Sequence, residues 1–323
     1  MPPSQRARAG ASGIACRPME WGVTLPHLGR VGTRDGLTSF ASEVDRLGFA
    51  SGWASDHVCW PAELVSKYPY SDDGSFPAPP KTGWLDPIGT LLFVAAVTEN
   101  LRLGFSVLIL PYRPPVETAK RLATIDVLSN GRLILGVGVG WMREEAEVLG
   151  MPWDRRGKRS DEQLEVFKAL FTEDDPSFDG EFYSFPAVGF EPKPVQDPVP
   201  VWVGGNTAAA YRRVAQHGHG FHAAFETVDE VASGWSGVGA ACDAVGRDRS
   251  EITLSLRYYL DPASAMKPEV SIAGSTEQMI DSVGRVAEAG VTHFVLDPVA
   301  RGGIEGRLEA LRAFMADVAP HFA

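Results

Sequence analysis

The chain has 323 residues, of which 44% are hydrophobic and 22% are charged, a composition typical of globular proteins. The formal net charge of -11 argues against a nucleic-acid-binding protein, since such proteins usually present a basic face. Cys16, Cys59 and Cys242 lack the CxxC spacing and imply no disulfide framework, so we expect a reducing, cytoplasmic location. No apolar stretch is long enough to predict a membrane-spanning helix.

The first eighteen residues differ from the rest of the chain. They contain arginines but no acidic residues, and they lack the apolar stretch that a signal peptide requires. We therefore predict a disordered tail over residues 1–18 and a single folded domain over residues 19–323. Met19 directly precedes the first predicted strand and is a candidate for the native start.

The chain then alternates between strand and helix patterns. A buried strand is predicted over residues 20–26, and Asp35 is expected to open the helix that follows. A short strand over 52–57 comes next, and Asp86-Pro87 is a typical helix start. The alternation continues with a strand at 101–110, a helix at 114–128, a strand at 132–138, and helices from Met142 and over 155–171.

Residues 172–198 interrupt this alternation with a proline-rich stretch, and Asp179-Gly180 within it predicts a hairpin turn. Thr227 and Ser275 each begin a capping-box pattern, which predicts a helix start at both places. The remaining predicted elements are strands at 199–204, 220–225, 252–260 and 292–297, and helices from Asn206, from Thr227 towards Val245, from Ser275 and around Leu308.

Eight strand–helix units in a chain of this length favour a (β/α)8 TIM barrel. The insertions would be residues 58–85, after the second strand, and residues 172–198, before the fifth. An open doubly wound sheet is the alternative fold.

In such a barrel the active site lies at the carboxyl ends of the strands. Asp56-His57 closes the second strand, and a histidine there suits proton transfer near neutral pH. The same pair could equally be a structural cap of a loop. The other polar or glycine-rich strand ends are Pro26-His27, Gly104-Phe105-Ser106, the run 136–141 (GVGVGW) and Gly204-Gly205-Asn206.

Two glycine-rich segments resemble ligand-binding turns. The turn from Gly204 to Thr207 could hold a phosphate at a helix start, or it could be a tight turn capped by Asn206 or Thr207. The run Gly136, Gly138, Gly140 has the spacing GxGxG rather than GxGxxG and lies on the fourth strand, so we reject a Rossmann fold. These glycines could instead admit a planar ring against the barrel mouth.

The two histidines of His217-Gly218-His219 resemble a pair of metal ligands. It falls in a helix-to-strand turn, at the end of the barrel away from the expected active site, and a metal needs three or four converging ligands. We therefore predict no metal. The sequence also lacks the GxSxG and Walker motifs of serine hydrolases and NTPases.

Taken together, the strand ends resemble the luciferase-like monooxygenase superfamily, in its branch that uses the deazaflavin coenzyme F420. The match runs from residue 21 to about 222, with a weaker tail. The segments that carry it are 52–58 (GWASDHV), 68–71 (YPYS), 76–79 (FPAP), 84–87 (WLDP), 101–104 (LRLG), 122–129 (LATIDVLS), 131–133 (GRL), 136–141 (GVGVGW) and 201–205 (VWVGG).

The resemblance implies a bacterial-luciferase-like barrel, a homodimer, and a ring-shaped cofactor bound at the strand ends. By this resemblance Asp56 contacts the cofactor and His57 is the catalytic proton donor or acceptor. Several members have a non-prolyl cis peptide on strand three, whose counterpart here is Ser106-Val107. The other implied cofactor contacts are Leu108 and Ile109 beside the cis peptide, Val139, Gly140, Trp141 and Glu144 after strand four, and Gly204, Gly205, Asn206 and Thr207 at the phosphate end.

One departure separates this chain from the sugar-phosphate dehydrogenases of the superfamily. Those members carry a proton-accepting glutamate just after the glycine run, where this chain has Trp141, so we do not expect a sugar-phosphate substrate handled in that way. The expected activity is F420-dependent hydride transfer to or from a small organic substrate covered by Tyr68, Tyr70, Phe76 and Trp84 of the first insertion. The alternatives are an FMN-dependent monooxygenase and a non-catalytic flavin-binding protein.

Overall fold

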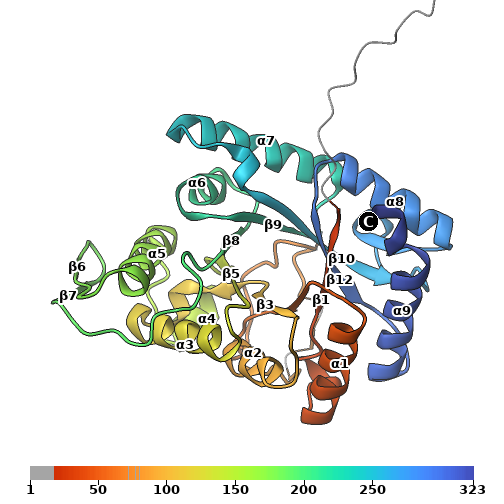
Figure 1. Ribbon diagram of the computed structural model, residues 1–323, viewed down its shortest axis with the longest axis horizontal. Helices are drawn as coiled ribbons and strands as arrows, with labels where there is room; N and C mark the ends of the chain where they lie inside the picture. Colours follow the sequence, from red (N-terminus) through yellow and green to blue (C-terminus); the bar gives the residue numbers. More distant parts are fainter. Residues whose placement is uncertain (1–17, 72, 77, 80) are drawn as a thin grey trace, which may run out of the picture.

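The computed structural model of the chain describes residues 18–323 apart from positions 72, 77 and 80. Eight parallel strands form a closed barrel with helices around it (Figure 1). The first strand, β1 (Glu20–Thr24), pairs with β2 (Ser51–Ala54) on one side and with the last strand, β12 (His293–Pro298), on the other. This closure confirms the (β/α)8 barrel and rules out the open sheet. The predicted tail lies, except for Pro18, outside the described residues.

The remaining barrel strands are β3 (Arg102–Phe105), β5 (Leu133–Gly138), β8 (Val201–Gly204), β9 (Gly220–Ala224) and β10 (Thr253–Asp261). Three short additions are β4 (Leu108–Ile109), the β6–β7 hairpin (Phe178–Asp179 and Ser184–Phe185) and β11 (Ser271–Ala273). The helices are α1 (Arg34–Arg46), α2 (Pro87–Ala95), α3 (Pro115–Leu128), α4 (Arg143–Val148), α5 (Arg156–Thr172), α6 (Ala208–His217), α7 (Val228–Val245), α8 (Thr276–Glu288) and α9 (Gly303–Asp317).

The predicted helix starts are mostly confirmed. Both capping boxes form, at Thr227 and at Ser275. Asp86 caps α2, and Thr207 rather than Asn206 caps α6. The start of α1 was wrong by two residues, because Thr33 has the extended backbone of a cap and accepts a hydrogen bond from a backbone N–H, whereas Asp35 already lies in the first helical turn.

The third strand is interrupted, where the sequence predicted one continuous strand over 101–110. β3 and β4 both pair with β5, and the peptide bond between Ser106 and Val107, which separates them, is cis. These two residues are half-buried, while Leu108 and Ile109 directly after them are buried. Ser106 and Val107 thus lie late in strand three, near the carboxyl ends of the strands, which we call the barrel mouth.

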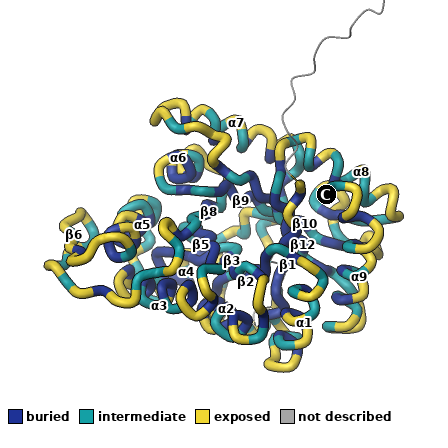
Figure 2. The backbone as a smooth tube through the Cα atoms, in the orientation of Figure 1, coloured by how far each residue is buried: buried dark blue, intermediate teal, exposed yellow. Residues whose placement is uncertain are grey.

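The barrel interior is filled rather than open, and the buried backbone is concentrated in the central strands (Figure 2). Part of the filling is a chain of hydrogen-bonded polar side chains. His222 lies 2.9 Å from the hydroxyls of both Ser106 and Ser255, and His293 continues the chain from Ser255 at 3.0 Å. Burial lowers the pKa of His222 to about 3, so its imidazole is neutral at physiological pH.

The two predicted insertions are both present. Of the described residues in the first insertion, Phe76 and Trp84 pack on His57 at the mouth. The β6–β7 hairpin confirms the predicted turn at Asp179-Gly180 and projects beyond α5 (Figure 1). None of the helices within the described residues combines the length and the apolar character that a bilayer crossing requires.

Candidate active site

His57 lies at the mouth and is hydrogen-bonded to a buried glutamate. β2 ends at Ala54, so His57 belongs to the loop directly after the strand. Its Nδ1 is 2.7 Å from Oε2 of Glu145, a residue of α4 with no exposed surface. The other oxygen of Glu145 accepts hydrogen bonds from the backbone N–H groups of Val58 and Cys59. Burial raises the pKa of Glu145, but these hydrogen bonds outweigh it and the net effect is a lowered pKa.

Aromatic side chains surround the His57 ring, and we call them the aromatic cluster. The ring centroid of Trp84 is 4.8 Å from that of His57, and the centroid of Phe76 is 5.6 Å away. Trp141 stacks on Phe76 at 5.6 Å and also contacts Tyr68. Members of the aromatic cluster are Trp60, Tyr68, Phe76 and Trp84 of the first insertion, and Trp141 after β5. His57 is only 8% exposed as a result.

Asp56 points away from His57 and forms a buried ion pair. Its carboxylate accepts hydrogen bonds from two guanidinium nitrogens of Arg113, at 2.6 and 2.8 Å, and from the backbone N–H of Ile109 at 2.9 Å. Burial lowers the pKa of Arg113, but Asp56 more than offsets this, and the pKa is raised. Asp56 therefore ties the end of strand two to strand three, and its contact with a cofactor stays a prediction.

Glu144 and Glu145, adjacent on the short helix α4, hold two different parts of the first insertion. Oε1 of Glu144 accepts hydrogen bonds from the backbone N–H groups of Val65 and Ser66, at 2.9 and 2.8 Å. The glutamate named from the sequence thus anchors the insertion in this structure, and its neighbour Glu145 contacts the histidine.

The glycines on β5 make room for the interruption of strand three, and their predicted contact with a planar ring stays a prediction. A Cβ on Gly136 would lie 1.7 Å from the carbonyl oxygen of Phe105, and a Cβ on Gly138 would lie 2.4 Å from a methyl group of Val107. A Cβ on Gly204 would lie 2.9 Å from the other methyl group of Val107. Val107 is therefore seated between strands β5 and β8 at the mouth.

The other predicted contacts lie around the same mouth. Val139, Gly140 and Trp141 are half-buried in the turn after β5, and Gly140 has a φ of 78°, which favours glycine. Ile109 packs with Tyr112 and Ala146, and Leu108 belongs to the main core. The turn after β8 contains half-buried Gly204 and Gly205 and exposed Asn206 and Thr207. The cofactor roles of all these residues stay predictions.

A half-buried arginine that the sequence did not indicate also reaches the mouth. Arg257 of β10 forms an ion pair with Asp297 of β12 and donates a hydrogen bond to the Ser106 hydroxyl at 3.3 Å. Asp297 accepts a further hydrogen bond from Thr24 at 2.9 Å. The Arg257 guanidinium lies over the ring of Phe225, 5.1 Å from its centroid, and its Nε is buried without a hydrogen-bond partner.

Glu226, two residues beyond β9, is a second residue that the sequence did not indicate. It is 4% exposed, and neither carboxyl oxygen has a hydrogen-bond partner. Burial raises its pKa to about 7, and the nearby Glu230 acts in the same direction. A buried, unpaired carboxyl group at a barrel mouth is a candidate functional group.

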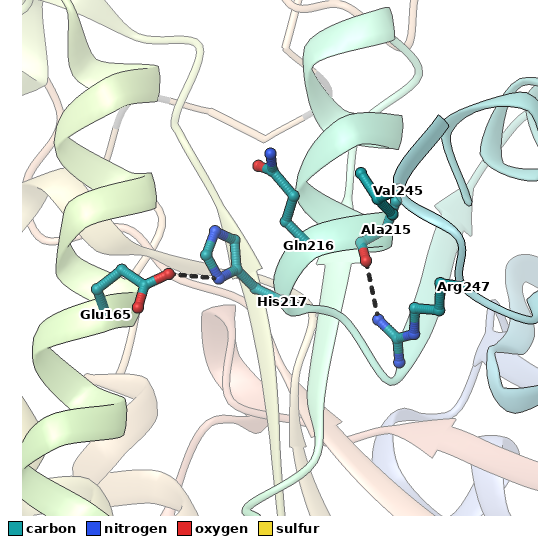
Figure 3. Close-up of a pocket in the computed structure, with 6 residues that line it drawn as sticks. All are labelled: Glu165, Ala215, Gln216, His217, Val245 and Arg247. Atoms are coloured by element: carbon teal, nitrogen blue, oxygen red, sulfur yellow. Dashed lines mark hydrogen bonds and ion pairs between the residues drawn. The ribbon is translucent and has the colours of Figure 1, made fainter. Parts of the chain in front are cut away.

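The His217-Gly218-His219 turn lies at the opposite end of the barrel, as expected, beside a cavity of about 460 Å³ (Figure 3). His217 and Glu165 both line this cavity and form an ion pair, with Nδ1 of His217 3.3 Å from the carboxylate of Glu165. His219 instead accepts a hydrogen bond from the backbone N–H of Val201 at 3.1 Å. The two imidazoles thus have separate protein partners, and the described residues contain no cluster of three or more His, Cys, Asp and Glu side chains placed to hold a metal.

The chain is similar in sequence to several known proteins. An uncharacterised protein of Mycobacterium tuberculosis is 32% identical over 257 residues, which cover 79% of this chain and 82% of the relative. An F420-dependent glucose-6-phosphate dehydrogenase of Amycolatopsis mediterranei is 31% identical over 194 residues, 59% of this chain and 53% of that protein. An FMNH2-dependent dimethylsulfone monooxygenase of Pseudomonas putida is 40% identical over 119 residues, 36% of this chain and 32% of that protein.

Solved structures share the fold at lower identity. A monooxygenase of Streptomyces bottropensis has a TM-score of 0.75 at 21% identity, covering 94% of this chain and all of that chain. The F420-dependent tetrahydromethanopterin reductase of Methanopyrus kandleri has a TM-score of 0.75 at 16% identity, covering 95% of this chain and all of that chain. Residues 19–264 match the family described as luciferase-like monooxygenase. With its barrel and its mouth residues in place, the chain therefore belongs to the luciferase-like monooxygenase family.

Proposed function

We propose that this chain is an oxidoreductase that binds coenzyme F420 at the barrel mouth and transfers a hydride between the deazaflavin and a small organic substrate. The observation that carries the proposal is the pair of His57 and Glu145, because it holds an imidazole in a fixed orientation inside the aromatic cluster. The similarity to an F420-dependent dehydrogenase over more than half of the chain supports the choice of cofactor.

The residues of the mouth fit a ring-shaped cofactor with a phosphate-bearing tail. Val107 offers an apolar contact at the centre of the mouth, and Arg257 Nε is a buried donor without a partner. The turn after β8 is open, since a Cβ on Gly205 would meet its nearest neighbour only at 3.6 Å. The backbone N–H groups of this turn and the start of α6 favour an anion such as a phosphate. When bound, the deazaflavin would supply the carbon centre that gives or accepts the hydride.

The residues of the chain would supply the proton and would exclude water from the reacting groups. With Nδ1 of His57 donating to Glu145, Nε2 is the ring atom that holds or releases a proton on the substrate side. Within the described residues, Nε2 has no hydrogen-bond partner. The aromatic cluster around it excludes water, which strengthens polar interactions at the mouth.

Titration of the purified protein with coenzyme F420 and, separately, with FMN tests the cofactor. Quenching of tryptophan fluorescence reports binding, because Trp60, Trp84 and Trp141 lie at the mouth. We expect saturable binding of F420. Tight binding of FMN without affinity for F420 would overturn the proposal.

Measurement of enzymatic turnover in variants tests the catalytic role of His57. His57→Ala is expected to lose activity while it still binds the cofactor, and His321→Ala, an exposed histidine near the end of the chain, is the matched control. Unchanged turnover in His57→Ala would remove His57 from the mechanism. Absence of turnover with any hydride partner would favour a non-catalytic flavin-binding protein.

An FMN-dependent monooxygenase is the second candidate function. It is favoured by the 40% identity to an FMNH2-dependent monooxygenase over 119 residues. Oxygen consumption with reduced FMN and a substrate distinguishes it from the first. We also propose that the chain is a homodimer, which light scattering of the purified protein tests.

A further inference from the structure

The Glu226 side chain lacks the partners that a buried carboxylate needs. The residue is 4% exposed, and both of its carboxyl oxygens are without hydrogen bonds in the structure. Burying an ionised carboxylate without a partner costs several kcal/mol, so such a group usually keeps its proton. A neutral carboxylic acid has one O–H to donate and a carbonyl oxygen to accept.

Glu226 lies across the mouth from His57. Around the barrel the strands follow the order β1, β2, β3, β5, β8, β9, β10, β12, so that β2 and β9 are four strands apart in either direction. His57 follows β2, and Glu226 follows β9. A molecule that spans the mouth would therefore meet the imidazole at one end and the carboxyl group at the other.

Tyr70 of the first insertion lies near both Glu226 and Arg257. Burial raises the pKa of Tyr70 to about 12, Glu226 acts in the same direction, and Arg257 acts against it, so the phenol lies within electrostatic reach of both. The ring centroid of Tyr70 is 6.4 Å from that of Phe225, which stacks on Tyr259 at 4.4 Å. Three aromatic rings, of Tyr70, Phe225 and Tyr259, therefore lie together beside Arg257.

The charged group nearest to Glu226 on α7 also favours its neutral form. Glu230 of α7 is a like charge, and the phenols of Tyr211 on α6 and Tyr258 on β10 both sense the Glu226 charge. Tyr258 donates to the backbone carbonyl of Glu226 and not to its side chain. Arg257 is already paired with Asp297. Burial and Glu230 together raise the pKa of Glu226 to about 7.

We propose that Glu226, as a neutral carboxylic acid, donates a hydrogen bond to the carbonyl or hydroxyl oxygen of an uncharged, mostly apolar substrate. The inference rests on the proposed function, because it takes the mouth as the substrate site. The aromatic side chains would contact the apolar body of the substrate. A phosphate or carboxylate is disfavoured near Glu226, because a neutral carboxyl group offers an anion no positive charge and the charge of Arg257 is already balanced by Asp297.

Infrared difference spectroscopy of the full chain tests the protonation state directly. Wild type is expected to show the carbonyl stretch of a protonated carboxylic acid at pH 6, and this band should weaken as the pH passes about 7. The band should be absent from Glu226→Gln and retained in Asp229→Asn, which removes an exposed carboxylate of the same segment. Identical spectra of wild type and Glu226→Gln at pH 6 would overturn the proposal.

A ligand arm of the same experiment tests the hydrogen bond. Cyclohexanone should shift the band of wild type to lower frequency, whereas methylenecyclohexane, which has the same shape without the oxygen, should not. In Glu226→Leu the preference for the ketone in binding should fall roughly three- to tenfold, the scale of one hydrogen bond. No shift with cyclohexanone, or an equal shift with both probes, would overturn the proposal.

The two proposals fail in different ways. The band and its shift are measured without a cofactor, so they do not depend on F420 or FMN binding. A protein that binds neither cofactor but shows the band and its shift would contradict the proposed function alone. A protein that binds F420 but lacks the band would contradict only the role of Glu226. Thermal unfolding of each variant verifies that it folds.

Discussion

Nδ1 of His57 lies 2.7 Å from Oε2 of Glu145, although the two residues are 88 positions apart in the chain. Glu145 is buried, and its second oxygen is held by the backbone of the residues that follow His57. The carboxylate therefore fixes the ring and directs its other nitrogen towards the aromatic cluster. Because an imidazole that donates from one nitrogen presents the other as the proton-transfer atom, this contact decides which atom faces the substrate.

Glu145→Gln is expected to lower kcat on the order of 100-fold and to change KM much less. A glutamine can present an N–H to Nδ1 of His57, which favours the wrong tautomer without emptying the site. Steady-state kinetics measures the effect. Glu147→Gln is the control, because Glu147 lies on the same helix with 61% of its side chain exposed. An equal loss in both variants would show that the helix, not the contact, was disturbed.

Asp56→Asn is expected to destabilise the fold by about 3 kcal/mol, because it leaves the Arg113 guanidinium buried opposite an uncharged partner. Urea unfolding measures the change in the free energy of unfolding. The control is Glu117→Gln, which breaks an exposed ion pair with Arg121 and should cost less than about 1 kcal/mol. Similar costs for the two variants would mean that the Asp56 pair contributes no more than a surface pair.

Gly138→Ala is expected to destabilise the protein by about 1–3 kcal/mol, because the added methyl group would lie 2.4 Å from a methyl of Val107. Val107→Ala removes that methyl, so the double variant should recover much of the loss. A double-mutant cycle by urea unfolding measures the coupling between the two sites. If the effects of the two substitutions are additive, a clash with Val107 is not the reason why alanine at position 138 destabilises the protein.

Glu226→Gln is expected to stabilise the protein above neutral pH and not in acid. Folding raises the pKa of Glu226 from 4.5 to about 7, so between these values the folded protein holds a proton that the unfolded chain has released. The stability of wild type therefore falls as pH rises through this window, and the glutamine variant escapes the fall. Since one pKa unit corresponds to about 1.4 kcal/mol, the gain near pH 8 should approach about 3 kcal/mol and vanish near pH 4.

Unfolding by urea at a series of pH values measures this difference. Asp229→Asn serves as the comparison, since Asp229 is exposed. A gain for Glu226→Gln that stays constant from pH 4 to pH 8 would contradict the pKa shift and indicate an effect of shape alone.

Much of the fold could be predicted because the elements carry local signals. The capping boxes at Thr227 and Ser275 and the Asp86-Pro87 start act over three or four residues, so the sequence displays them completely. The interruption of strand three could not be derived from apolar pattern, since residues 101–110 read as one buried run. Only the resemblance to a family pointed to Ser106-Val107, and the cis peptide lies there.

The candidate site was predictable only in part, because its key contacts join distant segments. His57 could be placed at the mouth by counting strands, but its partner could not. Glu144 and Glu145 are neighbours on a six-residue helix, too short for a periodic pattern to say which one faces inward. Arg257 could have been indicated by the sequence, because it is a charged residue on the inward face of a strand whose apolar residues alternate. Glu226 precedes a capping box and reads as an ordinary polar loop residue.

The two glutamates of the short helix α4 have different structural roles at the mouth. Its two glutamates hold the insertion at Val58-Cys59 and at Val65-Ser66, and Trp84 returns to the barrel by donating to the Ser55 carbonyl. The insertion is thus held by hydrogen bonds at Ser66 and again at Trp84. The sequence of the insertion can therefore change, and the range of substrates can change with it. The orientation of the His57 ring stays the same.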